Sequence, residues 1–204
     1  RYAIGKLHAR QERWAEATAA WQQALAADST FAPAYADLAS RHLTQDPPRH
    51  YDEAVPLLQR LVALRPDDPA LEAKLARVMA QAPRYSGEAL PALESAAERN
   101  PGDITLPLWI GKLSWRAADL GRALDAYRRA AQMDSGYAGV LEGLAAAQKA
   151  TGDTAAAIAT LQQIASLDTS GSGRERVAGA LGVLLYEQER YAEAIPHLRE
   201  KLRS

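Results

Sequence analysis

The sequence contains no cysteine and only 1 phenylalanine among its 204 residues. Without cysteine the chain has no disulfide scaffold, no thiolate metal site and no cysteine nucleophile. No apolar run reaches the roughly 18 residues that a membrane-spanning helix needs, so we expect no membrane insertion. The formal net charge of −1 lacks the basic excess of a dedicated nucleic-acid binder, and we expect no nucleic-acid partner.

Motifs for catalysis and cofactor binding are also missing. The sequence has no glycine-rich phosphate loop, no nucleophile elbow and no pair of histidines one helical turn apart. Paired acids such as Asp67 and Asp68 fall at expected helix starts, where capping and the helix dipole account for them. We therefore expect a non-enzymatic protein that carries no cofactor.

Alanine, by contrast, makes up about a fifth of the chain, and Leu, Gln, Glu and Arg supply much of the rest. These are the strongest helix formers. Abundant alanine also provides the small side chains that closely packed helices need where they touch. The composition therefore predicts an all-α fold.

One short pattern recurs along the chain. It consists of a bulky residue, two free positions, an alanine, and a large apolar residue four positions after that alanine, as in Trp14 to Ala17 with Trp21. The steps between successive anchor alanines are 37, 35, 34, 34 and 37 residues, which is typical of a two-helix repeat. The six anchors are Ala17, Ala54, Ala89, Ala123, Ala157 and Ala194.

A second series of small residues lies upstream of the anchors, each directly after an aliphatic residue. Two helices that cross at about 8–10 Å need small side chains where their axes come closest. A glycine or alanine on a first helix, opposite the anchor alanine on a second helix, meets this need. The upstream series consists of Gly5, Ala39, Ala76, Gly111, Ala145 and Gly182.

The two series predict six antiparallel helix pairs. Helix stops such as Asp28-Ser29 and Asn100-Pro101 separate them. Prolines 56, 91 and 196 are expected in the first turn of a second helix, where the backbone N–H has no partner in any case. The expected pairs are 1–12 with 15–27, 31–44 with 51–64, 68–81 with 87–99, 103–116 with 120–133, 137–150 with 154–167, and 174–188 with 191–203. The corresponding repeats are about 1–30, 31–67, 68–102, 103–136, 137–170 and 174–204 of a single solenoid.

These residues resemble the tetratricopeptide repeat (TPR) family over nearly the whole chain, and most closely in the first and fourth repeats. The chain departs from the family midway along the first helices, where the expected aromatic is replaced by His8, His42, Met79, Ser114, Gln148 and Leu185. The resemblance implies a right-handed superhelical solenoid of about six repeats. It also implies a protein-interaction scaffold that binds an extended peptide or a partner helix in a concave groove lined by the first helices.

Groove residues can be carried over from the family by their register on the first helix. Such a surface would grip an acidic or aromatic-bearing segment through charge-assisted contacts and an aromatic anchor. The alternative to a binding role is that these side chains only solvate an exposed helix face. The predicted groove residues are Lys6, Ser40, Arg77, Lys112, Trp115, Lys149 and Tyr186.

Some specific functions are disfavoured. A clamp for chaperone tails uses asparagines on successive first helices, whereas this chain has a single asparagine, Asn100, at a helix end. The long turn from Thr44 to His50 brings His42, His50, Asp46 and Asp52 near one another in sequence, but two histidines across a Pro-Pro loop match no metal-ligand spacing, so we expect no metal site. Residues 170–173 (Ser-Gly-Ser-Gly) are typical of a flexible joint.

The chain opens inside a first helix and closes inside a second, so we expect a segment of a longer protein whose localisation this sequence does not fix. Ile195, Leu198 and Leu202 are expected to face outward, where a following repeat, a partner or a second copy would cover them. Two alternatives to a plain scaffold stay open. One is a module of a bacterial envelope or polysaccharide-secretion assembly, and the other is the substrate-presenting arm of a larger enzyme.

Overall fold

The structure is a computed structural model that describes residues 1–45, 50–167 and 172–203. These residues form 12 α-helices and one short 3₁₀ helix, and they include no β-strand, which confirms the expected all-α fold. The chain divides into two compact units, Arg1–Pro101 and Gly102–Ser204. The predicted Ser-Gly joint and the Pro-Pro loop fall largely outside the described residues.

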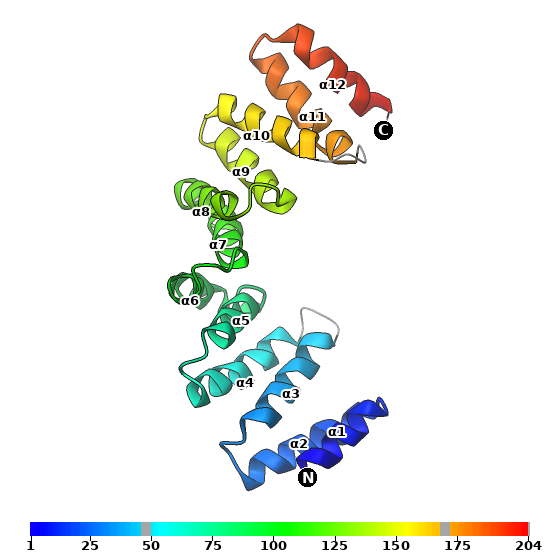
Figure 1. The fold of residues 1–204 in the computed structure, drawn as a ribbon, viewed down its shortest axis with the longest axis vertical. Helices are drawn as coiled ribbons and strands as arrows, with labels where there is room; N and C mark the ends of the chain where they lie inside the picture. The colour runs from blue at the N-terminus through cyan, green and yellow to red at the C-terminus, as the bar shows by residue number, and fades with distance from the viewer. Residues whose placement is uncertain (46–49, 168–171, 204) are drawn as a thin grey trace. The chain divides into compact units, whose positions relative to one another are not determined.

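Each unit is a stack of three helix pairs (Figure 1). The first unit consists of α1 (Tyr2–Arg10), α2 (Trp14–Ala27), α3 (Ala32–Thr44), α4 (Tyr51–Leu64), α5 (Pro69–Met79), the 3₁₀ helix η1 (Pro83–Tyr85) and α6 (Ser86–Arg99). The second unit consists of α7 (Thr105–Arg116), α8 (Leu120–Met133), α9 (Ala138–Ala150), α10 (Thr154–Leu167), α11 (Ser172–Glu187) and α12 (Tyr191–Arg203). All predicted helix bounds agree with these to within two residues.

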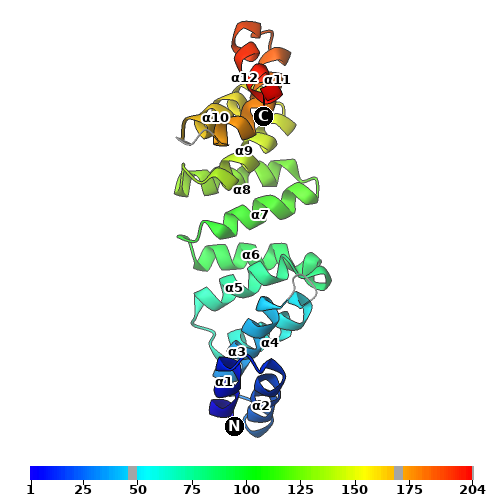
Figure 2. The ribbon, with the colours of Figure 1, turned by 90° about the vertical axis from the view of Figure 1, so that its right-hand side faces the viewer.

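Consecutive helices pack against each other within each unit, as Figure 2 shows. In the first unit α1 pairs with α2, α3 with α4 and α5 with α6, and the pairs stack through contacts of α2 with α3 and of α4 with α5. The second unit repeats this order from α7 to α12, and α7 also contacts α9. A first helix therefore touches its own partner and the second helix of the preceding pair, which is the arrangement of a solenoid.

The anchor alanines lie at the helix crossings, as their spacing predicts. Five of the six have no exposed surface, and Ala194 has 1%. Their upstream partners are buried as well. A larger side chain at these positions would push the two axes beyond the distance at which the flanking large residues interdigitate.

Tyr127 on α8 shows how tight these crossings are. Its ring lies between Gly111 of α7 and Gly143 of α9, and only 5% of the residue is exposed. A Cβ atom added at Gly111 would lie 2.8 Å from the ring, and one at Gly143 would lie still closer. Both glycines are therefore required by the aromatic ring that fills the space between the two first helices.

The expectation for the three prolines is wrong in one respect. Pro56, Pro91 and Pro196 are each the sixth residue of their helix, in the second turn, where a backbone N–H would normally bond to the carbonyl four residues earlier. Each proline is exposed, so the carbonyl that it leaves without a helical partner lies on the side of the helix that faces water. The helices continue through all three positions for this reason.

Among the described residues, a left-handed residue closes the turn inside four helix pairs. Glu12, Ala118 and Glu189 have φ between 58° and 59°, and Gly152 has φ of 85°. In each case the next residue's N–H donates to a carbonyl five positions back, as from Asp119 to Ser114 at 2.9 Å. This is the pattern of a Schellman C-cap, which favours glycine at the left-handed position.

Replacing Ala157 by leucine tests the crossing positions. Ala157 is fully buried on α10, and Ala159 is exposed on the same helix. We expect Ala157→Leu to lower the free energy of unfolding by about 1–3 kcal/mol because the added atoms overpack the crossing. The matched control, Ala159→Leu, is expected to change it by no more than about 0.5 kcal/mol. Urea unfolding followed by circular dichroism measures both, and equal effects would contradict the assignment of the crossing.

The left-handed turns give a reciprocal pair of substitutions. Ala118→Gly is expected to raise the free energy of unfolding by about 0.5–1 kcal/mol because it removes the Cβ strain. Gly152→Ala is expected to lower it by about 1 kcal/mol, since it introduces the same strain. The two changes are measured by chemical denaturation, and shifts of the same sign would argue against the left-handed conformation.

Candidate functional site

The residues predicted to line a groove all lie on the first helices of their pairs. Six of the seven are exposed, and Arg77 on α5 is half-buried. The first unit contains Lys6 on α1, Ser40 on α3 and Arg77, and the second contains Lys112 and Trp115 on α7, Lys149 on α9 and Tyr186 on α11. Their role in binding stays a prediction.

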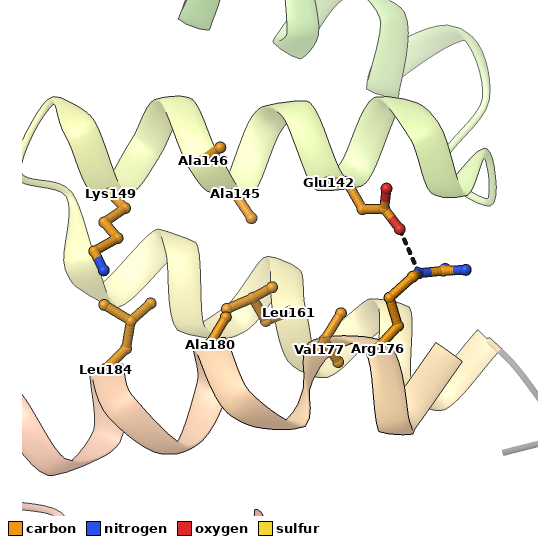
Figure 3. A pocket seen from close by; sticks show the side chains of 9 residues that line it. All are labelled: Glu142, Ala145, Ala146, Lys149, Leu161, Arg176, Val177, Ala180 and Leu184. Carbon is orange, nitrogen blue, oxygen red and sulfur yellow. Dashed lines mark ion pairs between the residues drawn. The ribbon is translucent and has the colours of Figure 1, made fainter. Parts of the chain in front are cut away.

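The second unit contains a pocket of about 290 Å³ between α9 and α11. Alanines line much of its wall, and their small side chains leave the space between the two helices open (Figure 3). The pocket is lined by Glu142, Ala145, Ala146, Lys149, Leu161, Arg176, Val177, Ala180 and Leu184.

Polar side chains stand at the two ends of this pocket. Lys149 lies near Leu184 at one end, and Glu142 and Arg176 face each other at the other end, with alanines between them (Figure 3). The Arg176 Nε atom lies 2.5 Å from Glu142 Oε1, and both side chains are about half exposed. Lys149 has no ion-pair partner among residues 1–45, 50–167 and 172–203. The pocket is thus an apolar trough with an available ammonium group at one end.

The predicted residues contribute unequally to this pocket. Lys149 is part of its lining, whereas Tyr186 lies outside it and packs its ring against Tyr191 at a centroid distance of 5.3 Å. Arg176 and Glu142 were missed because they lie earlier on their helices than the two register positions that the family pattern marks. Opposite charges at the starts of consecutive first helices are the signal that would have found them.

A smaller pocket of about 230 Å³ in the first unit brings Lys6 and Ser40 together. Asp37 also lines this pocket, and its carboxylate accepts a hydrogen bond from the Tyr2 hydroxyl at 2.8 Å and lies 3.5 Å from the Lys6 ammonium. Burial and this hydrogen bond raise the pKa of Tyr2 to about 12. Asp37 therefore partly neutralises Lys6, while Arg41, which also lines the pocket, lies over the Trp14 ring at 4.5 Å from its centroid.

The two tryptophans of α7 have different surroundings. Trp109 is half-buried, and the Lys112 ammonium lies 4.9 Å from the centroid of its ring, a cation–π contact. Trp115 is 39% exposed. Trp115 is therefore the more accessible indole, as its predicted role requires, while Lys112 is held in part by Trp109.

The outer face of α12 agrees with expectation at two of three residues. Ile195 is 46% exposed and Leu202 is 87% exposed. Leu198 instead is partly buried, because it packs against the apolar cluster of α9 to α11 and over Gly182. Self-association through this face stays a prediction. In the part of the chain that the structure describes, no helix is both long and apolar enough to span a membrane.

Comparisons with known proteins agree with this architecture. Residues 49–104 match the family model described as "Tetratricopeptide repeat". The chain is similar in structure to MamA (TM-score 0.72, 17% identity, 84% of this chain and 90% of that chain). It is also similar to MamA from Desulfovibrio magneticus RS-1 (TM-score 0.72, 15% identity, 84% and 93%) and to YrrB, a TPR protein with an unusual peptide-binding site (TM-score 0.68, 19% identity, 84% and 87%). No curated protein matches the sequence.

The stacked helix pairs, with small residues at each crossing, define an all-α solenoid of the TPR type. The family match covers α4, α5, η1 and α6, and the structural neighbours extend the same fold over most of the chain. Residues 49–104 therefore match the tetratricopeptide repeat family, and the structural neighbours show the TPR fold over 84% of the chain.

Proposed function

We propose that this protein is a non-enzymatic interaction scaffold that holds an extended peptide segment in the pocket between α9 and α11. The observation that carries the proposal is the apolar trough with the Lys149 ammonium at one end. Concave, mostly apolar sites with a few convergent polar groups are the usual form of a ligand site. YrrB, which is similar in fold, has a peptide-binding site, and this supports a peptide as the ligand class.

The lining residues indicate which side chains a peptide would present. An apolar side chain of about the size of valine or leucine fits over Ala146, Ala180 and Val177. A carboxylate on a neighbouring residue of the peptide would reach Lys149, and this contact would be charge-assisted. The ion pair of Glu142 and Arg176 closes the far end and leaves little net charge there.

The energies explain why one pocket is not enough for tight binding. Burying a valine or leucine side chain contributes about 1.5–3 kcal/mol. A hydrogen bond to a charged group adds about 1.5–3 kcal/mol. Ordering an extended peptide offsets much of this. We therefore expect a segment that also contacts α7, where Lys112 and the exposed Trp115 provide a second polar and aromatic contact within the same unit.

A peptide array tests this proposal. We expect the full chain to select peptides in which an apolar residue is flanked by Asp or Glu. Lys149→Glu is expected to lower the affinity for these peptides by about tenfold or more, because it reverses the charge at one end of the pocket. Ala146→Leu is expected to have a similar effect, since the added side chain fills the pocket from an exposed position of α9.

Arg129→Glu on α8 is the matched control. It makes the same basic-to-acidic change at an exposed position that is not part of the pocket lining. Circular dichroism confirms that each variant keeps its helical content. If every array hit binds both pocket variants as tightly as it binds the control, the α9–α11 pocket is not the binding site.

A further inference from the structure

Two histidines and a glutamate converge where α3 ends and α4 begins. His42 lies in the last turn of α3, His50 directly precedes α4, and Glu53 lies in the first turn of α4. One ligand atom from each lies within 4.8 Å of the other two. No other group of this kind occurs in the ranges that the structure describes. The sequence predicted no metal site, because the spacing of the two histidines along the chain matches no known motif.

The distances suit a small divalent cation. When three atoms lie within 4.8 Å of one another, some point lies within about 2.8 Å of all three, and Zn²⁺ binds histidine nitrogen and carboxylate oxygen at about 2.0–2.2 Å. Movements of less than about 1 Å for each ligand atom therefore form the site. His50 Nδ1 already lies 3.7 Å from Glu53 Oε2, and the two imidazole centroids are 6.0 Å apart.

The surroundings of His42 single this cluster out. Its Nδ1 atom is shielded from solvent and has no hydrogen-bond partner, which is unfavourable for a buried polar atom. His8 occupies the same repeat position on α1 and shares this feature, but it belongs to no group of three possible metal ligands in the described ranges. The unsatisfied nitrogen alone therefore does not define the site. What distinguishes His42 is the second imidazole and the carboxylate next to it.

Asp52, which lies next to Glu53, does not belong to the ligand set. Its carboxylate accepts a hydrogen bond from the Arg84 backbone N–H at 3.1 Å and lies 3.8 Å from the Arg84 Nε atom. Asp52 is thus engaged with η1. The single carboxylate of Glu53 is left to balance the cation, and it also offsets the repulsion from the positive end of the α4 dipole.

We propose that His42, His50 and Glu53 bind a divalent metal ion such as Zn²⁺. Imidazole and carboxylate ligands suit Zn²⁺ among the common cations, and three protein ligands leave a fourth position for water. The bound ion would join the end of α3 to the start of α4. It would therefore act as a clamp on the turn of the second helix pair.

Isothermal titration with ZnCl₂ on the untagged full chain, in a buffer that does not chelate metals, tests the proposal. We expect one Zn²⁺ per chain and a higher Tm when Zn²⁺ is present, since the ion binds the folded state. Co²⁺ in the same site is expected to show visible d–d absorption from four-coordinate cobalt. Absence of Zn²⁺ binding to the unaltered chain overturns the proposal.

The variants identify the ligands. His42→Gln, His50→Gln and Glu53→Gln are each expected to weaken Zn²⁺ binding by at least about tenfold, because loss of even an outer-shell partner has effects of 10–100-fold. His8→Gln and His197→Gln are the matched controls and are expected to bind Zn²⁺ as the unaltered chain does. Glu53→Gln keeps the size of a side chain that is 52% exposed, so it tests the site without disturbing the fold. Binding that is unchanged in Glu53→Gln and both cluster histidine variants overturns the assignment.

Discussion

The closest approach between paired helices is the constraint on which the rest of this structure depends. Helix axes can come within about 8–10 Å only where both side chains at the crossing are small. The anchor alanines are almost entirely buried, and the glycines opposite Tyr127 have no room for a Cβ atom. Large residues such as Trp21 and Tyr127 then fill the space on either side of a crossing. At each crossing, small side chains let the two helices touch, and large aromatic or aliphatic side chains around them interlock.

This constraint also determines where binding surfaces can arise. Helices inside each stack contact a neighbour on two sides, and the first helices keep exposed positions between these contacts. In the second unit those positions on α9 and α11 are alanines flanked by Lys149 and Arg176, and the result is a trough rather than a packed core. At the α3–α4 turn the same architecture brings His42 to the start of the next helix, which is what places it beside His50 and Glu53.

The fold was predictable from the sequence because its signal is periodic and local. Small residues at fixed spacing gave the helix pairs to within two residues, and Asp68 and Asp119 cap the helices that follow them. The site was only partly predictable. Lys149 follows from the repeat register, but Glu142 and Arg176 at the other end of the pocket are 34 residues apart in the chain and pair only in three dimensions. The sequence brought His42 and His50 into one candidate group, which their spacing disfavoured, because the distance between side chains across a turn is not visible in residue spacing.

A double-mutant cycle between Gly143 and Tyr127 measures the crossing constraint most directly. Alanine has a higher helix propensity than glycine, so Gly143→Ala by itself favours the helix by about 1 kcal/mol. The substitution also places a Cβ atom against the Tyr127 ring. The account predicts that Gly143→Ala destabilises the chain when Tyr127 is present and is neutral or stabilising in a Tyr127→Leu background, with a coupling energy of about 1 kcal/mol or more. An equal effect of Gly143→Ala in both backgrounds would contradict it.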